Sequence, residues 1–231
     1  MTDSGMSGND VADAFSLHAE DYDRWFDSPE GQALFELEVK AVRLLMKDMF
    51  PPFLEIGVGS GRFAAALGIR YGVEPAEALL DMAKKRGVKV EKAFGEKLPF
   101  PNGIFGGVFI LFTLCFVKEP EKVIAEAQRV LKKGGGLVLG IINRESPWGD
   151  FYRTKAAEGH PIYKHARFYG VREVTALIED AGLTVEAFSS TLCRPPAYAP
   201  HDDTVQAGLL EDAGFICIRA RKIDNRGTND H

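Results

Sequence analysis

The sequence has little cysteine, no long hydrophobic run and no excess of positive charge. Three cysteines (Cys115, Cys193, Cys217) in 231 residues are too few and too widely spaced for a disulfide framework or a zinc site, so no metal site is expected. The longest apolar runs, such as 108–117, fall short of the ~20 residues that a membrane helix needs. Asp and Glu outnumber Lys and Arg by 33 to 28, and the basic residues are scattered, which argues against a nucleic-acid surface. We therefore expect a cytoplasmic protein, monomeric or homodimeric, without nucleic-acid or membrane partners.

What the sequence does contain is a regular alternation of short apolar runs with amphipathic segments. This alternation predicts an α/β fold whose parallel sheet is covered by helices on both faces. The predicted strands are 53–56, 71–74, 88–93, 104–112, 137–142, 183–192 and 215–221. The predicted helices are 11–26, 32–49, 62–67, 76–86, 119–131 and 171–180.

The composition shows no shift large enough to separate a second domain. Residues 1–10 are mostly small and polar, which predicts a flexible tail. Residues 11–231 are expected to form a single domain. Within it we expect a helical cap at 11–50, a cofactor-binding half at 51–142 and a substrate-side half at 143–231.

The first predicted strand ends in a turn that carries glycine at every second position, Gly57, Gly59 and Gly61. Glycine permits positive φ angles and removes side-chain bulk, so a ligand can lie against the backbone at the N-terminus of the next helix. Glu74 ends the second predicted strand, near the spacing at which a carboxylate binds ribose hydroxyls. The two features together predict a cofactor that contains a nucleoside.

A dinucleotide fingerprint would require a glycine at position 62, where this sequence has Arg62. The pattern Glu55-x-Gly57-x-Gly59-x-Gly61 instead resembles motif I of the class I methyltransferases that use S-adenosylmethionine. Further segments look like landmarks of the ubiquinone and menaquinone biosynthesis type (methyltransferase type 11), and they stand at 72–75, 98–101 and 126–135. The resemblance implies a Rossmann-like, doubly wound sheet of seven strands in the order 3-2-1-4-5-7-6, with the last strand antiparallel.

The same resemblance implies roles for individual residues. Glu55 and the backbone of Gly57, Gly59 and Gly61 would hold the methionine moiety of the cofactor. Glu74 would hold the ribose hydroxyls, with Pro75 beside it, and Thr113 would line the site below the transferable methyl group.

The adenine end departs from the family pattern, because Phe94 stands where an aspartate usually binds the adenine amino group. Phe94 could stack on the base while the Gly95 amide donates to the ring, or Phe94 could simply point into the core.

The N-terminal cap resembles the Tyr-Asp lid of this family, so Tyr22 would close over the cofactor near the methyl group. Many relatives have a histidine where this sequence has Phe116. The segment 159–169 supplies His165 as a candidate general base, because an unperturbed imidazole titrates near neutral pH. A structural role for this histidine is the alternative.

These observations predict a methyltransferase that moves a methyl group from S-adenosylmethionine to a small-molecule acceptor by in-line displacement at nitrogen, oxygen or carbon. A binding or regulatory protein that keeps the cofactor site without turnover is the first alternative. A nicotinamide-dependent reductase is the second, and Arg62 disfavours it.

Overall fold

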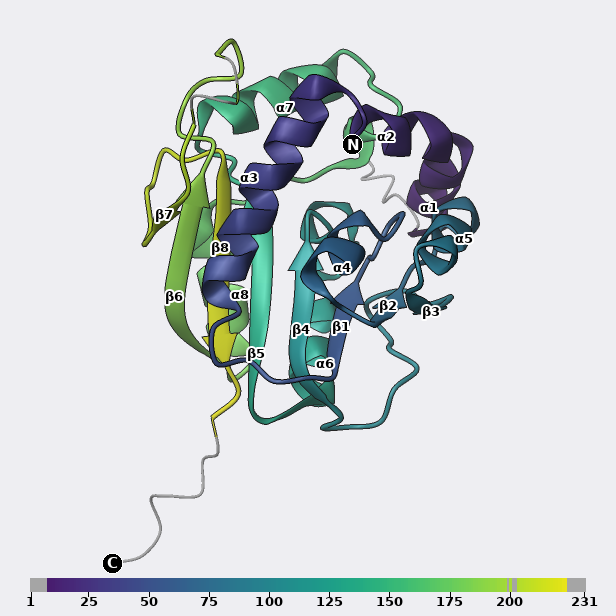
Figure 1. Cartoon of the computed structure of the whole chain (residues 1–231), viewed down its shortest axis with the longest axis vertical. Helices are drawn as coiled ribbons and strands as arrows, with labels where there is room; N and C mark the ends of the chain where they lie inside the picture. Colours follow the sequence, from purple (N-terminus) through teal and green to yellow (C-terminus); the bar gives the residue numbers. More distant parts are fainter. Residues whose placement is uncertain (1–7, 199, 201–202, 224–231) are drawn as a thin grey trace, which may run out of the picture.

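The computed structural model describes residues 8–198, 200 and 203–223 (Figure 1). Within these residues the chain forms one eight-stranded sheet in the order β3-β2-β1-β4-β5-β8-β6-β7. The strands are β1 (Phe53–Ile56), β2 (Tyr71–Val73), β3 (Lys89–Glu91), β4 (Phe105–Leu111), β5 (Leu131–Ile142), β6 (Thr184–Thr191), β7 (Gln206–Ala207) and β8 (Phe215–Arg221). Strands β1 to β5 pair in parallel, and β8 runs antiparallel between β5 and β6. The predicted order is confirmed, and the two-residue edge strand β7 is the one addition.

Helices cover both faces of the sheet (Figure 1). Helices α3 and α4 lie in front of it in this view, and α6 and α8 lie behind. The α-helices are α1 (Gly8–Leu17), α2 (Ala19–Trp25), α3 (Pro29–Leu45), α4 (Arg62–Leu67), α5 (Glu77–Lys85), α6 (Pro120–Val130), α7 (Pro147–Ala157) and α8 (Val171–Asp180). Two short 3-10 helices are η1 (Leu114–Phe116) and η2 (Tyr163–His165). None of the helices in the described part of the chain is long and apolar enough to cross a membrane.

The core consists of two apolar layers, one on each face of the sheet. Every residue of the central strand β4 is buried, as expected for a strand that is covered on both sides. The sheet is therefore a rigid platform, and the connections at the carboxyl ends of its parallel strands are free to build a site.

The N-terminal region differs from the prediction in two ways. The expected flexible tail is wrong for residues 8–10, which begin α1, while the rest of that tail lies outside the described residues. The single helix expected at 11–26 is instead two helices that are separated at His18, whose φ of −109° and ψ of 16° are not helical. The break gives α1 and α2 different directions, so that together they cover the edge of the sheet.

Three further boundaries differ from the prediction. Helix α3 begins at Pro29 because the Ser28 side chain accepts a hydrogen bond from the Gly31 amide (3.0 Å) and so caps the first turn. Strand β5 begins at Leu131 and includes the glycine run that was expected to precede it. Helix α7 was not predicted, although the Ser146 cap and the proline at its first position are clear start signals.

Candidate functional site

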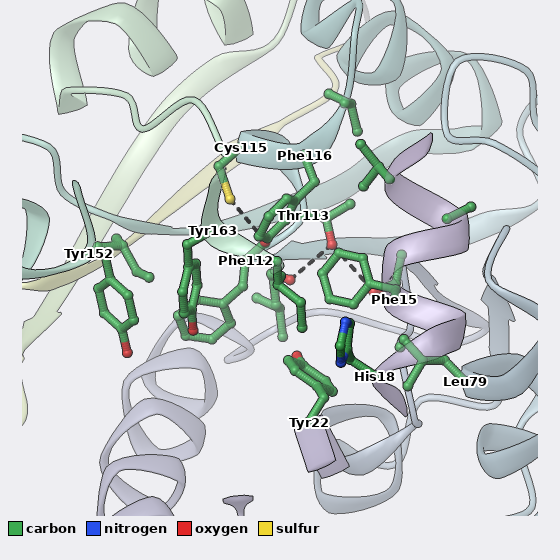
Figure 2. Close-up of a pocket in the computed structure, with 18 of the residues that line it drawn as sticks. Phe15, His18, Tyr22, Leu79, Phe112, Thr113, Cys115, Phe116, Tyr152 and Tyr163 are labelled. Atoms are coloured by element: carbon green, nitrogen blue, oxygen red, sulfur yellow. Dashed lines mark hydrogen bonds between the residues drawn. The ribbon is translucent and has the colours of Figure 1, made fainter. Parts of the chain in front are cut away.

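A cavity of about 550 Å³ lies where the parallel strands end, and residues between Gly8 and Tyr163 form its walls. Its floor is formed by the residues that follow β1, β2 and β4, and helices α1, α2, α3 and α7 surround it. Figure 2 shows Tyr152 and Tyr163 on one side and Leu79 on the other, with Tyr22 and Thr113 between them. The cavity therefore extends from α5 at one end to α7 and η2 at the other.

The three glycines of the turn after β1 all have positive φ angles, but they differ in their surroundings. A Cβ atom on Gly57 would lie 2.4 Å from the Thr113 side chain, and one on Gly61 would lie 2.9 Å from the Ala83 Cα. A Cβ atom on Gly59 would meet no atom within 4 Å. Gly57 and Gly61 thus permit close packing within the protein, whereas Gly59 leaves open space on the cavity side.

Both carboxylate oxygens of Glu74 accept hydrogen bonds from backbone amides, and one of these amides belongs to the glycine turn. Oε2 accepts a hydrogen bond from the Gly59 amide (2.8 Å), and Oε1 accepts one from the Ala76 amide (2.9 Å). The residue is 6% exposed and lines the cavity. Burial raises the pKa of Glu74 to about 7, although the two backbone hydrogen bonds act in the opposite direction. The carboxylate is therefore held in one orientation beside the open face of Gly59.

A second carboxylate, Glu55 of β1, lies beneath the same turn. It is 2% exposed, and its Oε2 atom has no hydrogen-bond partner among the described residues. Burial and the neighbouring Glu74 raise the pKa of Glu55 well above its usual value. A buried carboxylate oxygen without a partner fits a positively charged ligand group. Glu55 itself is not one of the residues that line the cavity.

The end of the cavity next to α5 contains Leu79 and the ring of Phe94. Pro75, Phe94 and Gly95 line it, as the sequence analysis expected for the adenine end. Phe94 does not point into the core, because it is 39% exposed. Its ring lies against α1, where a Cβ atom added to Gly8 would be 3.1 Å away. A planar group could enter between this ring and the floor of the cavity.

Tyr22 lies on the cavity wall at the centre of a set of aromatic contacts from the cap. Its ring packs edge-on against Phe15 (centroids 5.6 Å apart) and Phe26 (5.7 Å). Phe15 in turn contacts Phe116, which follows β4 (5.0 Å). Helices α1 and α2 thus form a lid whose aromatic rings reach the residues after β4. Burial raises the pKa of Tyr22 far above its usual value, so its hydroxyl stays protonated.

The expectation for His165 differs from the structure, which does not bring this residue to the cavity wall. It lies in η2, where the turn directs His160 and Tyr163 to the cavity instead. Burial lowers the pKa of both histidines. Because a general base must reach the proton that it removes, the geometry does not support His165 in that role.

Sequence reasoning missed several wall residues at the end of the cavity next to α7. Trp148 and Tyr152 come from α7, and Glu38 comes from the buried face of α3. The signal for Glu38 was a carboxylate four residues after Leu34 and three before Ala41, within an apolar helical stripe. Among the described residues, no cluster of His, Cys, Asp or Glu side chains is arranged to hold a metal ion.

Comparison with known proteins agrees with this geometry. Residues 54–139 match the family described as a methyltransferase domain, Methyltransf_11. A solved structure from Thermotoga maritima, described as a SAM-dependent methyltransferase and possible histamine N-methyltransferase, is 36% identical with a TM-score of 0.84. The match covers 92% of this chain and 99% of that one.

Two curated proteins extend the comparison. An uncharacterized protein of Mycobacterium tuberculosis is 42% identical over 232 residues, which cover 100% of this chain and 79% of that protein. The ubiquinone/menaquinone biosynthesis C-methyltransferase UbiE of Zymomonas mobilis is 26% identical over 92% of this chain and 87% of its own length. These matches favour S-adenosylmethionine over a nicotinamide cofactor. The chain therefore belongs to the class I methyltransferases of the type 11 group, and its cofactor is S-adenosylmethionine.

Proposed function

We propose that this methyltransferase transfers the methyl group to a small-molecule acceptor that binds in the half of the cavity next to α7. The bound cofactor supplies a methyl carbon that is made electrophilic by the positively charged sulfur. The protein has to align the acceptor with that carbon and exclude water, and this requires no covalent intermediate with the enzyme. In-line displacement at nitrogen, oxygen or carbon is compatible with these demands.

The single observation that carries this proposal is the hydrogen bond from the Gly59 amide to Glu74, beside the open face of Gly59. A carboxylate held in this way can accept hydrogen bonds from the two ribose hydroxyls. The backbone of Gly57 and Gly59, which line the cavity, would hold the methionine end, and Glu55 and Gly61 would support the turn from beneath. In this arrangement Thr113 lies below the methyl group.

The other cofactor contacts are proposed from the end of the cavity next to α5. Phe94 would stack on the adenine ring, with the Gly95 amide as a donor and Pro75 against the ribose side. Tyr22 would cover the reacting atoms from the lid and exclude water. Tyr22 then acts through shape rather than as a base, because its hydroxyl stays protonated.

Two measurements test the proposed function. Isothermal titration calorimetry with S-adenosylhomocysteine is expected to show one tight site per chain. An assay with methyl-labelled S-adenosylmethionine against a panel of small amines, phenols and carbon acids is expected to show transfer to at least one class. Cofactor binding without transfer to any member would support the non-catalytic alternative, and absence of binding would refute the assigned site.

A further inference from the structure

One acidic side chain of the cavity has no role in the cofactor site described above. Glu38 projects from the middle of α3, and it lines the cavity together with Glu30 and Leu34, at four-residue intervals on the same helix face. Glu38 is 7% exposed. Among the described residues, the Glu38 side chain forms no hydrogen bond and no ion pair. An acidic group is thus directed into the cavity without a protein partner.

The titratable groups that face Glu38 are neutral. They come from four elements, and the Glu38 charge acts on each of them: Tyr22 of α2, Tyr152 of α7, Tyr163 of η2 and Cys217 of β8. Burial raises the pKa of all four, so they stay protonated at neutral pH. The Glu38 carboxyl group therefore acts on three neutral phenols and one neutral thiol, and none of them supplies a positive charge.

Two cations on elements next to α3 and the cavity, Arg219 of β8 and Lys155 of α7, have other partners. Arg219 of β8 donates to the carbonyl oxygens of Leu45 and Lys47 at the far end of α3, and it pairs with Glu186 (3.3 Å). Lys155 Nζ lies over the Phe151 ring, 4.4 Å from its centroid. Neither cation is paired with Glu38.

The wall of the cavity as a whole is acidic. It contains five carboxylic residues and two lysines, and these are Asp21, Glu30, Glu38, Glu74, Glu96, Lys118 and Lys155. An isolated buried carboxylate is strongly unfavourable, so a buried acid without a partner either stays protonated or receives a cation from a ligand. Aromatic faces such as those of Tyr152 and Tyr163 also attract cations. The chemistry of this end therefore suits a positively charged group.

We propose that Glu38 binds the ammonium group of the methyl acceptor, so that the acceptor is a small molecule with a protonated amine. This proposal rests on the proposed function, because it places the acceptor in the half of the cavity that lies beyond Tyr22 from Leu79 (Figure 2). The glycine turn and Glu74 already offer partners for the polar groups of the cofactor. Glu38 is then left for the acceptor.

Binding of this kind has a proton balance that can be measured. Burial raises the pKa of Glu38 to about 8, so the free protein holds a neutral carboxyl group at pH 7. An alkylammonium ion, like a lysine side chain, stays charged up to about pH 10. When it binds, the carboxyl group must ionise, and its proton passes to the buffer. The affinity for the amine should therefore rise about tenfold from pH 6 to pH 7 and level off above pH 8.

The test uses the full-length protein saturated with S-adenosylhomocysteine. Propylamine, phenethylamine and tryptamine are titrated by calorimetry, each beside the alcohol with the same carbon skeleton, in two buffers of different ionisation enthalpy. We expect at least one amine to bind at least tenfold more tightly than its alcohol and to release close to one proton at pH 7. If every amine binds no better than its alcohol, or if no proton is released, the proposal is wrong.

Two variants assign the effect to Glu38. Glu38→Gln should remove the preference for the amine and the proton release, and it should leave the affinity for S-adenosylhomocysteine unchanged. Glu36→Gln removes a carboxylate from the exposed side of the same helix and should behave as the wild type. Equal loss of cofactor affinity in Glu38→Gln would overturn the proposal by placing Glu38 in the cofactor site. If Glu38→Gln does not fold, Glu38→Met preserves the volume and serves the same comparison.

A failure of the proposed function gives a different result. In that case the wild-type protein does not bind S-adenosylhomocysteine in the first titration. If the cofactor product binds and the amines do not, only the assignment of Glu38 fails.

Discussion

Arg62 and Asp23 form a two-point ion pair that connects the lid to the glycine turn. Arg62 Nε lies 2.8 Å from Asp23 Oδ1, and Arg62 Nη2 lies 3.0 Å from Oδ2. Arg86 reaches the same carboxylate (2.7 Å) and also donates to the Ser60 carbonyl oxygen (2.8 Å). The arginine that replaces the third glycine of a dinucleotide site therefore holds α2 against the start of α4. This contact keeps Tyr22, the residue before Asp23, over the cavity.

Asp23→Asn should loosen this lid. Burial by itself would raise the pKa of Asp23. The hydrogen bonds from Arg62 and Arg86 outweigh this effect and hold the pKa well below its usual range. Loss of a charged, partly buried partner is expected to cost about 2 kcal/mol of unfolding free energy. Urea unfolding measures this loss, and stopped-flow binding should show faster release of S-adenosylhomocysteine. Glu20→Gln, on the exposed side of α2, is the control, and equal release rates in both variants would contradict the role of the ion pair.

Gly59→Ala should separate ligand binding from backbone strain. The φ of Gly59 is +55°, and an alanine in the left-handed region costs about 1–2 kcal/mol. Gly182, after α8, has a φ of +77° and equally open surroundings, so Gly182→Ala carries a similar strain far from the cavity. We expect similar losses in thermal stability but at least a tenfold loss of affinity for S-adenosylhomocysteine in Gly59→Ala alone. Unchanged affinity would show that no ligand lies against this turn.

Glu74→Gln should weaken cofactor binding at least tenfold, which corresponds to about 1.4 kcal/mol. The side-chain amide of glutamine has one oxygen that can accept a hydrogen bond and one NH2 group that can only donate. This NH2 group would face the backbone N–H of Gly59 or Ala76, which is also a donor. Calorimetry with S-adenosylhomocysteine measures the effect. Glu77→Gln removes an exposed carboxylate that pairs with Lys92 (2.6 Å), and it should retain wild-type affinity. Matching affinities for the two variants would refute the ribose assignment.

The unliganded protein should lose stability as the pH rises from about 4.5 to 8. Glu38 has a raised pKa of about 8 and Glu74 one of about 7, whereas both titrate near 4.5 when unfolded. The folded state thus binds more protons than the unfolded state in this range, and the free energy of unfolding falls with increasing pH. In Glu38→Gln this decrease should be smaller. Urea unfolding at pH 5.5 and 8.5 provides the measurement, and an identical slope in wild type and variant would show that Glu38 titrates normally.

Much of the fold follows from local sequence patterns. The apolar runs and the amphipathic stripes place the seven main strands, and the turn after β1 places the ligand edge. Helix α7 was not predicted because Trp148 and Gly149 are its only fully buried residues, so its sequence shows no clear apolar periodicity. Strand β5 begins earlier than expected because Leu131 and Gly136 pair with β4. This pairing is made by the backbone, and the side chains of the two residues do not indicate it.

Some residues of the candidate site could likewise be predicted from local sequence patterns, and others could not. The spacing of Gly59 and Glu74 in the sequence indicated a nucleoside cofactor, because a turn and a strand end are local features with fixed positions on a parallel sheet. The sequence could not show that His165 lies off the cavity wall and that Tyr163 lines it, since a single 3-10 turn decides which side chain faces the cavity.

By itself, then, the sequence determined the individual strands, the glycine turn and the acid that ends the second strand, because each depends on neighbours within one turn or one strand. Only the tertiary structure decided the position of Glu38, whose helical spacing is that of an ordinary core residue. Helix α7 is distant in the chain from α2 and α3, and the packing of the three helices leaves a hollow next to this carboxyl group. Whether a buried side chain meets protein or a ligand depends on such long-range packing.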